Sequence, residues 1–286
     1  MASFTFNNIY IDDWVCLAGP KESESKLKKV DFKMTDYYYG TKTFEQAEIK
    51  MQKLVIDNIL EKNAYKHSDI DLIIGGDLLN QSVATSYSLL NNPISFLGIY
   101  NACATFPESL IIGSIGLSND NLKKIMCITS SHNLATERQF RYPIEYGHSY
   151  PHTMTSTVTG AISVILSKTK GKIKIESGTI GKVIDMGIKD ASNMGAVMAP
   201  AAANTLYEHL TDLKRNIDYY DLILTGDLGC IGNKIFKDYT NTVYNIKIKK
   251  GLDAGCELYL NSQDVYAGGS GPVCLPLTFF SKIIPM

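Results

Sequence analysis

DIDLIIGGDLL (residues 69–79) and YYDLILTGDLG (residues 219–229) follow one pattern, 150 positions apart in the chain. Each has an Asp-Leu start, an apolar run typical of a buried strand, and a Gly-Asp stop. A buried strand that ends in such a turn is commonly followed by a helix. The sequence therefore predicts an internal duplication, and the duplication decides the architecture.

A second matching pair follows the first in the same order. Residues 94–117 (ISFLGIYNACATFPESLIIGSIGL) and residues 264–284 (DVYAGGSGPVCLPLTFFSKII) each begin with an apolar strand pattern that ends in a tyrosine. Small residues and an apolar helical pattern come next, and this alignment places Cys103 opposite Gly269. Two matches in one order indicate a true repeat.

The connecting segments alternate between helix and strand patterns. Residues 43–63 and 194–215 are predicted helices, the first amphipathic and the second interrupted early by a proline. Residues 156–168 and 171–183 are predicted to form a strand pair joined by a tight turn. Alternation of this kind favours mostly parallel sheets covered by helices on both faces.

The second copy is shorter than the first. After its helix the first copy continues into the strand pattern KKIMCITSSHN (residues 123–133), whereas the sequence closes at Met286 before any counterpart. We therefore expect an α/β fold with two pseudo-symmetric halves, residues 1–170 and 171–286, of which the second is incomplete.

Composition excludes several function classes. The 286 residues are 45% hydrophobic and 20% charged, as in ordinary folded proteins rather than disordered ones. The net charge of -1 gives no basic surplus, so no nucleic-acid partner is expected. No apolar run approaches the ~20 residues that span a bilayer, and the N-terminus lacks the pattern of a signal peptide. We expect an intracellular protein with reduced thiols and only peripheral membrane contact.

Cys103 is the sharpest candidate for chemistry. Small residues around it permit a tight strand-to-helix turn, and N–H groups of the following helix would lower the pKa of its thiol. The alternative is a packing role, because free cysteines are among the most buried residue types. No C-x-x-C pair occurs, so no zinc or thioredoxin-like site is expected. Neither a P-loop nor a dinucleotide fingerprint occurs, so we expect no cofactor. A packing role is assigned to the other cysteines, Cys16, Cys127, Cys230, Cys256 and Cys274.

A catalytic cysteine also needs a base and an oxyanion hole. Among the five histidines, His132 ends the strand after the Cys103 helix, so it is a candidate to lie near Cys103 at the same edge of the sheet. The turn Gly268, Gly269, Ser270 and Gly271 allows close backbone approach and offers N–H donors.

Residues 135–147 form a second candidate site. They hold Arg138, Arg141 and Tyr142, a combination of guanidinium and aromatic groups that suits a flat carboxylate ligand. The alternative is internal pairing of the arginines with nearby glutamates of the same segment.

With these segments in view, the chain resembles the stage V sporulation protein AD family, which has a thiolase-like fold. The resemblance runs through AGPKE (18–22), DIDLIIGGDLLNQ (69–81), NACAT (101–105), TSSHNLATERQFRYPIEYG (129–147), TSTVTGA (155–161), MAPAAANT (198–205), YYDLILTGDLG (219–229) and YAGGSG (266–271). It implies two similar α/β halves whose mixed sheets pack around shared helices. It also implies binding of dipicolinic acid and support of its uptake into the developing spore, with membrane proteins of the same operon as partners. A homodimer paired along a sheet edge and a location peripheral to the inner spore membrane follow from the same resemblance.

Thiolase-fold condensing enzymes combine a cysteine at a strand-to-helix turn with a histidine and an asparagine. The resemblance sets Cys103 at the nucleophile position, but the two partner positions fall at Gly226 and Gly269. We therefore expect a non-catalytic binding protein, and the alternatives are a residual thiolase-type acyltransferase using Cys103 or a scaffold that only docks membrane partners. The expected ligand-binding residues are Cys103, His132, Arg138, Arg141, Tyr142, Gly226, Gly268, Gly269 and Ser270.

Overall fold

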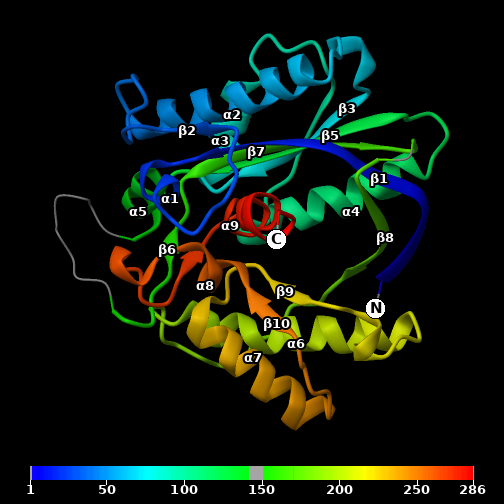
Figure 1. The fold of residues 1–286 in the computed structure, drawn as a ribbon, viewed down its shortest axis with the longest axis vertical. Coiled ribbons are helices and arrows are strands. Elements are labelled where there is room, and N and C mark those ends of the chain that lie inside the picture. Colours follow the sequence, from blue (N-terminus) through cyan, green and yellow to red (C-terminus); the bar gives the residue numbers. More distant parts are fainter. Residues whose placement is uncertain (1, 142–150, 170, 286) are drawn as a thin grey trace.

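A mixed sheet contains most strands of the first half together with one strand that follows residue 170. The computed structural model describes residues 2–141, 151–169 and 171–285, and within them seven strands form one sheet (Figure 1). These strands are β1 (Ala2–Ala18), β2 (Phe32–Lys33), β3 (Leu72–Asp77), β4 (Phe96–Gly98), β5 (Lys124–Ser131), β7 (Gly160–Ser167) and β8 (Ile173–Ile180). The order is β2-β1-β7-β5-β3-β4, and β8 pairs with β1. β3 is parallel to β4 and β5, whereas β7 is antiparallel to β5 and β1.

Helices cover both faces of this sheet. α2 (Phe44–Lys62) packs its buried stripe on one face, where Ile73 lies. α4 (Thr105–Leu117) and α9 (Cys274–Thr278) pack on the opposite face, where Ile74 lies. Neighbouring residues of a strand point to opposite faces, so a strand covered on both sides reads as a continuous apolar run. The apolar run within residues 69–79 has this origin.

The helix predicted over residues 43–63 is confirmed as α2. Thr43 is its N-cap, and the Thr43 hydroxyl accepts a hydrogen bond from the backbone N–H of Gln46 at 3.2 Å. A cap of this type contributes about 1 kcal/mol to the free energy of unfolding. Asn63 is the C-cap, so the helix begins and ends where the pattern predicts.

The second half repeats the first on a smaller scale. β9 (Ile223–Thr225) and β10 (Gly251–Asp253) pair in parallel as β3 and β4 do. This confirms the strand predicted within residues 219–229. The second match is wrong in position, because the counterpart of β4 is β10 and not the segment that begins at residue 264, so Gly269 is not the counterpart of Cys103. α6 (Met194–Asp212) and α7 (Gly229–Tyr244) lie side by side along the outer face of the second half (Figure 1). Within the described residues β9 pairs with β10 alone, whereas its counterpart β3 also pairs with β5.

Shorter elements complete the fold. They are α1 (Pro20–Ser23), α3 (Val83–Ser88), α5 (Asn133–Phe140), β6 (Ser156–Thr157), α8 (Ala254–Leu258) and β11 (Gly269–Ser270). β6 of the first half and β11 of the second half pair in parallel and so connect the two halves. Among the helices of the described ranges, none has both the length and the apolar character needed to cross a bilayer.

The predicted pairing of residues 156–168 with residues 171–183 is wrong. Both segments form strands, β7 and β8, but each pairs with β1 rather than with the other. Tyr10 of β1 lies opposite Ser167 on one side and Lys174 on the other. β1 is 17 residues long, and it lies between β7 and β8 and forms hydrogen bonds with both strands.

Two further predictions need correction. Tyr266 does not end a strand, because the chain enters β11 only at Gly269, after Gly268 takes a positive φ of 109°. Pro200 does not interrupt its helix, since α6 continues through it from residue 194 to residue 212. An internal proline costs about 3 kcal/mol in an isolated helix, and here the extensive packing of α6 on α7 offsets that cost.

Candidate functional site

The candidate site lies where three segments from the two halves meet. Cys103 occupies a single helical turn, Ala102–Ala104, directly before α4. Asp227 follows the end of β9, and Gly271 follows β11. Ala102 has a positive φ of 43°, an uncommon conformation for a residue with a side chain. The predicted tight turn at Cys103 is thus present, with its strain located one residue before the thiol.

The Cys103 thiol lies next to the Asp227 carboxyl group, and each group shifts the pKa of the other. The backbone N–H of Gly271 faces both groups and reaches Oδ2 of Asp227 in a long hydrogen bond of 3.5 Å. Burial and then the nearby Asp227 raise the pKa of the Cys103 thiol well above its usual value. The prediction that the helix lowers this pKa is wrong, because desolvation and an adjacent acid outweigh the field of the helix.

Burial also raises the pKa of Asp227, to about 6, and the charge of Asp253 acts in the same direction. The neighbouring Cys103 thiol and the backbone N–H of Gly271 only partly oppose this rise. Near neutral pH the site therefore holds a protonated thiol beside a carboxyl group that titrates close to pH 6.

The repeat explains why Asp227 is available to the site. Its counterpart Asp77 is committed to the fold, since it accepts hydrogen bonds from the backbone N–H of Leu79 at 2.9 Å and of Thr85 at 2.7 Å. In the second half Asp253 makes the equivalent hydrogen bonds, because it accepts from the backbone N–H groups of residues 228 and 229 at 2.9 and 3.0 Å. Asp227 is consequently free to face Cys103.

Sequence reasoning missed Asp227 as a site residue. The aspartate was visible as the Gly-Asp stop of the second repeat, but the prediction named only Gly226 before it. The Gly226 carbonyl oxygen lies 3.3 Å from the thiol of Cys274. Gly226 thus contributes a backbone carbonyl group near the site, and its neighbour Asp227 contributes the side chain that faces Cys103.

Gly268, Gly269 and Ser270 are buried and form the backbone wall behind the site. The Gly268 carbonyl accepts from the N–H of Ser156, and the Ser270 carbonyl accepts from the N–H of Val158, both at 2.9 Å. These carbonyl groups are therefore occupied within the fold, and Gly271 at the end of the same turn is the residue whose N–H faces the Cys103–Asp227 pair.

A disulfide bond joins Cys230 and Cys256, whose Cα atoms are 4.8 Å apart. It links the first turn of α7 to α8 directly behind the site, so the predictions of reduced thiols and of a simple packing role for these two residues are wrong. The repeat brings the two helix starts together, a proximity that the sequence separation of 26 does not indicate. Cys16, Cys127 and Cys274 are free and buried, which confirms their packing role.

Thiol counting tests this bond. The unfolded but unreduced protein is expected to expose four alkylatable thiols, and six after reduction, because Cys16, Cys103, Cys127 and Cys274 are free. The intact mass of the protein after iodoacetamide treatment in denaturant gives the number of alkylated thiols. The control Cys256→Ser should give five adducts with or without reductant, and six adducts on the untreated parent chain would contradict the assignment.

His132 is a structural residue of the first half. Its Nε2–H donates to the carbonyl oxygen of Tyr37 at 2.8 Å, and its Nδ1 accepts from the N–H of Ala135 at the start of α5. The ring packs between those of Tyr37 and Phe44, and burial lowers its pKa to about 4. The contacts of His132 among the described residues do not include Cys103, so the structure does not unite the two.

The two arginines of the second candidate site are paired within the fold. Arg138 forms an ion pair with Glu45 of α2 and lies over the ring of Phe44. Arg141 donates to Glu137 at 2.8 Å, one of the pairings that the sequence alternative named. The partner of Arg141 agrees with the alternative of pairing inside the segment, whereas Arg138 pairs outside it with Glu45. Ligand contact by either guanidinium stays a prediction.

Tyr142 and the glutamate at position 145 lie outside the described residues, so the structure does not place this part of the predicted clamp.

Comparison with known proteins shows the family and the fold of the chain. A family model described as Stage V sporulation protein AD (SpoVAD) matches residues 2–285. The stage V sporulation protein AD of Bacillus subtilis (strain 168) is 42% identical over 276 residues, which make up 96% of this chain and 82% of that protein.

Solved structures of OleA from Xanthomonas campestris share the fold. A cysteine-to-serine variant with bound lauric acid and lauroyl-CoA has a TM-score of 0.63 at 13% identity, covering 98% of this chain and 91% of that chain. OleA co-crystallised with cerulenin has a TM-score of 0.63 at 12% identity, covering 99% of this chain and 90% of that chain. At these identities the likeness concerns the fold alone, and it confirms the predicted thiolase-like α/β architecture.

Proposed function

Because this chain belongs to the stage V sporulation protein AD family, we propose that its role in sporulation is to bind dipicolinic acid and to support its uptake into the developing spore. In this proposal the chain delivers the acid to membrane proteins of the same operon and works at the surface of the inner spore membrane. The family membership establishes a sporulation protein, and the site supports the finer statement.

The observation that carries the proposal is the adjacent pair of Cys103 and Asp227 at the junction of the halves, with the backbone N–H of Gly271 beside it. Dipicolinic acid is a flat pyridine ring with two carboxylates. Below about pH 6 the protonated Asp227 is a donor suited to one ligand carboxylate, and the backbone N–H of Gly271, which otherwise makes only a long hydrogen bond to Asp227, lies beside it. The turn at Cys103 places the small residues Ala102 and Ala104 on either side of the thiol.

The same pair argues against acyl transfer. A nucleophilic thiol needs a neighbour that takes its proton, and Asp227, with a pKa of about 6, is far too weak a base for a thiol whose pKa lies well above its usual value. Support for a residual acyltransferase is limited to the fold shared with OleA. Binding without catalysis is therefore the better interpretation of the site.

A homodimer along the free edge of the sheet is part of the proposal. β4 is the edge strand, and two of its residues expose apolar side chains, Phe96 at 38% and Leu97 at 43%. Tyr100, just beyond the strand, is 50% exposed. An edge strand with apolar side chains favours pairing with another strand, and a second copy of the chain offers the same edge.

Calorimetric titration with dipicolinate, using benzoate as the one-carboxylate control, tests the proposal. We expect saturable binding of dipicolinate that is tighter at pH 5 than at pH 8, because Asp227 is protonated at the lower pH. Cys103→Leu is expected to abolish binding by filling the site, while Arg138→Ala and Arg141→Ala test the predicted clamp. A folded chain that takes up dipicolinate no better than benzoate would point to the scaffold alternative.

A further inference from the structure

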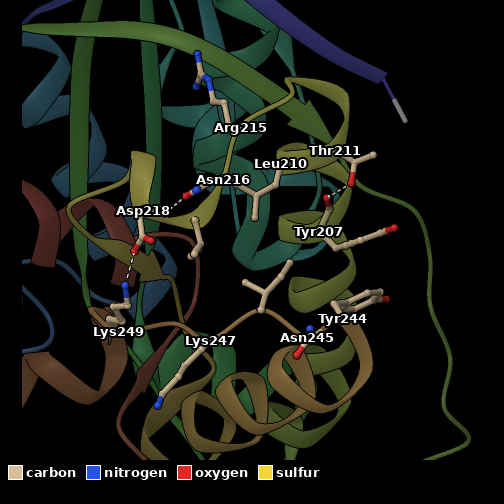
Figure 2. Close-up of a pocket in the computed structure, with 12 residues that line it drawn as sticks. Tyr207, Leu210, Thr211, Arg215, Asn216, Asp218, Tyr244, Asn245, Lys247 and Lys249 are labelled. Atoms are coloured by element: carbon tan, nitrogen blue, oxygen red, sulfur yellow. Dashed lines mark hydrogen bonds and ion pairs between the residues drawn. The ribbon is translucent and has the colours of Figure 1, made fainter.

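A hollow lies in the second half, at the end of β9 opposite to the candidate site. Asp227 follows the end of β9, whereas this hollow is lined by residues 215–218, which precede the strand, and by the last turns of α6 and α7 (Figure 2). Its volume is about 480 Å³. That volume falls in the range of roughly 300–1,000 Å³ that is usual for small-molecule sites.

The inner part of the hollow is apolar. Leu210, Ile217 and Ile246 line it, and all three are buried or half-buried. Tyr207 and Tyr244 lie on one side with their rings stacked at 4.5 Å between centroids (Figure 2). A floor of this kind suits aliphatic groups of a ligand rather than a bare ion.

The rim is polar and carries positive charge. Three cationic side chains and one acidic side chain line the hollow, in a chain whose net charge is -1. Lys249 is paired with Asp218 at 2.8 Å, and Lys247 lies on the same side of the hollow (Figure 2). Arg215 is turned to Glu176 of β8 at 3.1 Å. Lys247 is exposed and has no ion pair among the described residues, and its side chain points outward from the rim (Figure 2).

We infer that this hollow binds a phosphate ester carried by a short aliphatic body, the chemistry of an anionic lipid at a membrane surface. The phosphate meets Lys247 on the rim, and the first methylene groups of the chains cover Leu210, Ile217 and Ile246. A water-soluble phosphate ester shares the head but leaves this floor uncovered, so the lipid is the favoured source. The inference is independent of dipicolinate binding, because Cys103 and Asp227 lie at the other end of β9.

Three probes separate these contributions in titrations of the full chain. Dihexanoyl phosphatidic acid has the anionic head and short chains, dihexanoyl phosphatidylcholine has the same chains with a zwitterionic head, and glycerol 3-phosphate has the head alone. We expect saturable binding of phosphatidic acid below its micelle concentration and at least tenfold weaker binding of the other two. The affinity should fall with added salt, because the charges are exposed.

Variants assign the binding to this hollow. Lys247→Glu and Ile246→Asp are each expected to weaken binding of the phosphatidic acid at least tenfold. The matched control is Lys234→Glu, which makes the same charge change at an exposed position of α7 outside the hollow and should leave the affinity unchanged. Dipicolinate affinity should be unaffected by Lys247→Glu, so the two sites are scored separately.

Three results would overturn the inference. Absence of saturable binding by the folded chain removes the site. Equal affinity for glycerol 3-phosphate removes the lipid as its ligand. An equal loss in Lys234→Glu and Lys247→Glu reduces the effect to general charge attraction.

Discussion

Asp227→Asn is expected to raise the free energy of unfolding at pH 8 by up to about 3 kcal/mol and to leave it nearly unchanged below pH 4. Burial raises the pKa of Asp227 from 3.8 to about 6, so the folded chain holds this proton more tightly than the unfolded chain does. The stabilisation by the bound proton is complete below pH 3.8 and is lost as the pH rises through 6. A tenfold difference in proton affinity between the folded and unfolded chain corresponds to about 1.4 kcal/mol, and asparagine carries no charge at any of these pH values.

Urea unfolding at pH 4 and pH 8 measures this difference. Asp57→Asn is the matched control, because Asp57 is exposed on α2 and the same substitution there should change little at either pH. The Asp227→Asn protein should also lose the pH dependence of dipicolinate binding. A variant that is less stable than the parent at pH 8, or that keeps the parental pH dependence, would show that Asp227 is not the group titrating near pH 6.

Gly255→Ala is expected to cost at least about 3 kcal/mol of stability and to abolish ligand binding. An ideal Cβ at this position would lie 2.0 Å from the carbonyl oxygen of Gly269, which belongs to the backbone of β11. The backbone must move to relieve the clash, and the hydrogen bonds that Ser156 and Val158 donate to this segment break with it. Gly271, which faces Cys103 and Asp227, is displaced in the same movement.

Gly226→Ala is the control for this substitution within the same site. A Cβ at Gly226 would lie 3.5 Å from the nearest neighbour, the Cβ of Leu275, which is ordinary van der Waals contact. Its cost should stay below about 1 kcal/mol. Equal midpoints for the two variants in urea would mean that β11 is not held against α8 as tightly as the structure places it.

Local patterns in the sequence were sufficient for the architecture. The strands β3 and β9, the helix after Thr43 and the turn at Cys103 each depend on neighbouring residues, and each is where the pattern predicts it. Pairing partners depend on distant residues instead. The place of β1 between β7 and β8 could not be read from the short connection that joins those two strands in sequence.

The candidate site was predicted only in part, for the same reason. Cys103 was found because its turn is local. The direction of Asp227 depends on Asp253, which takes over the capping hydrogen bonds 26 residues later in the chain. The burial of His132 likewise depends on Tyr37 and Phe44, which are far from it in sequence. Side-chain roles of this kind follow from packing that periodicity does not encode.

The position of β1 has a consequence for the synthesis of the chain. β1 leaves the ribosome before its partners β7 and β8, which end at residues 167 and 180. At roughly 5–20 residues per second, β1 waits roughly 10–40 s for them with its apolar side chains unpaired. Sheets closed by such distant pairing also form slowly. Residues 2–18 are therefore a stretch that needs protection by a chaperone until β7 and β8 have been synthesised.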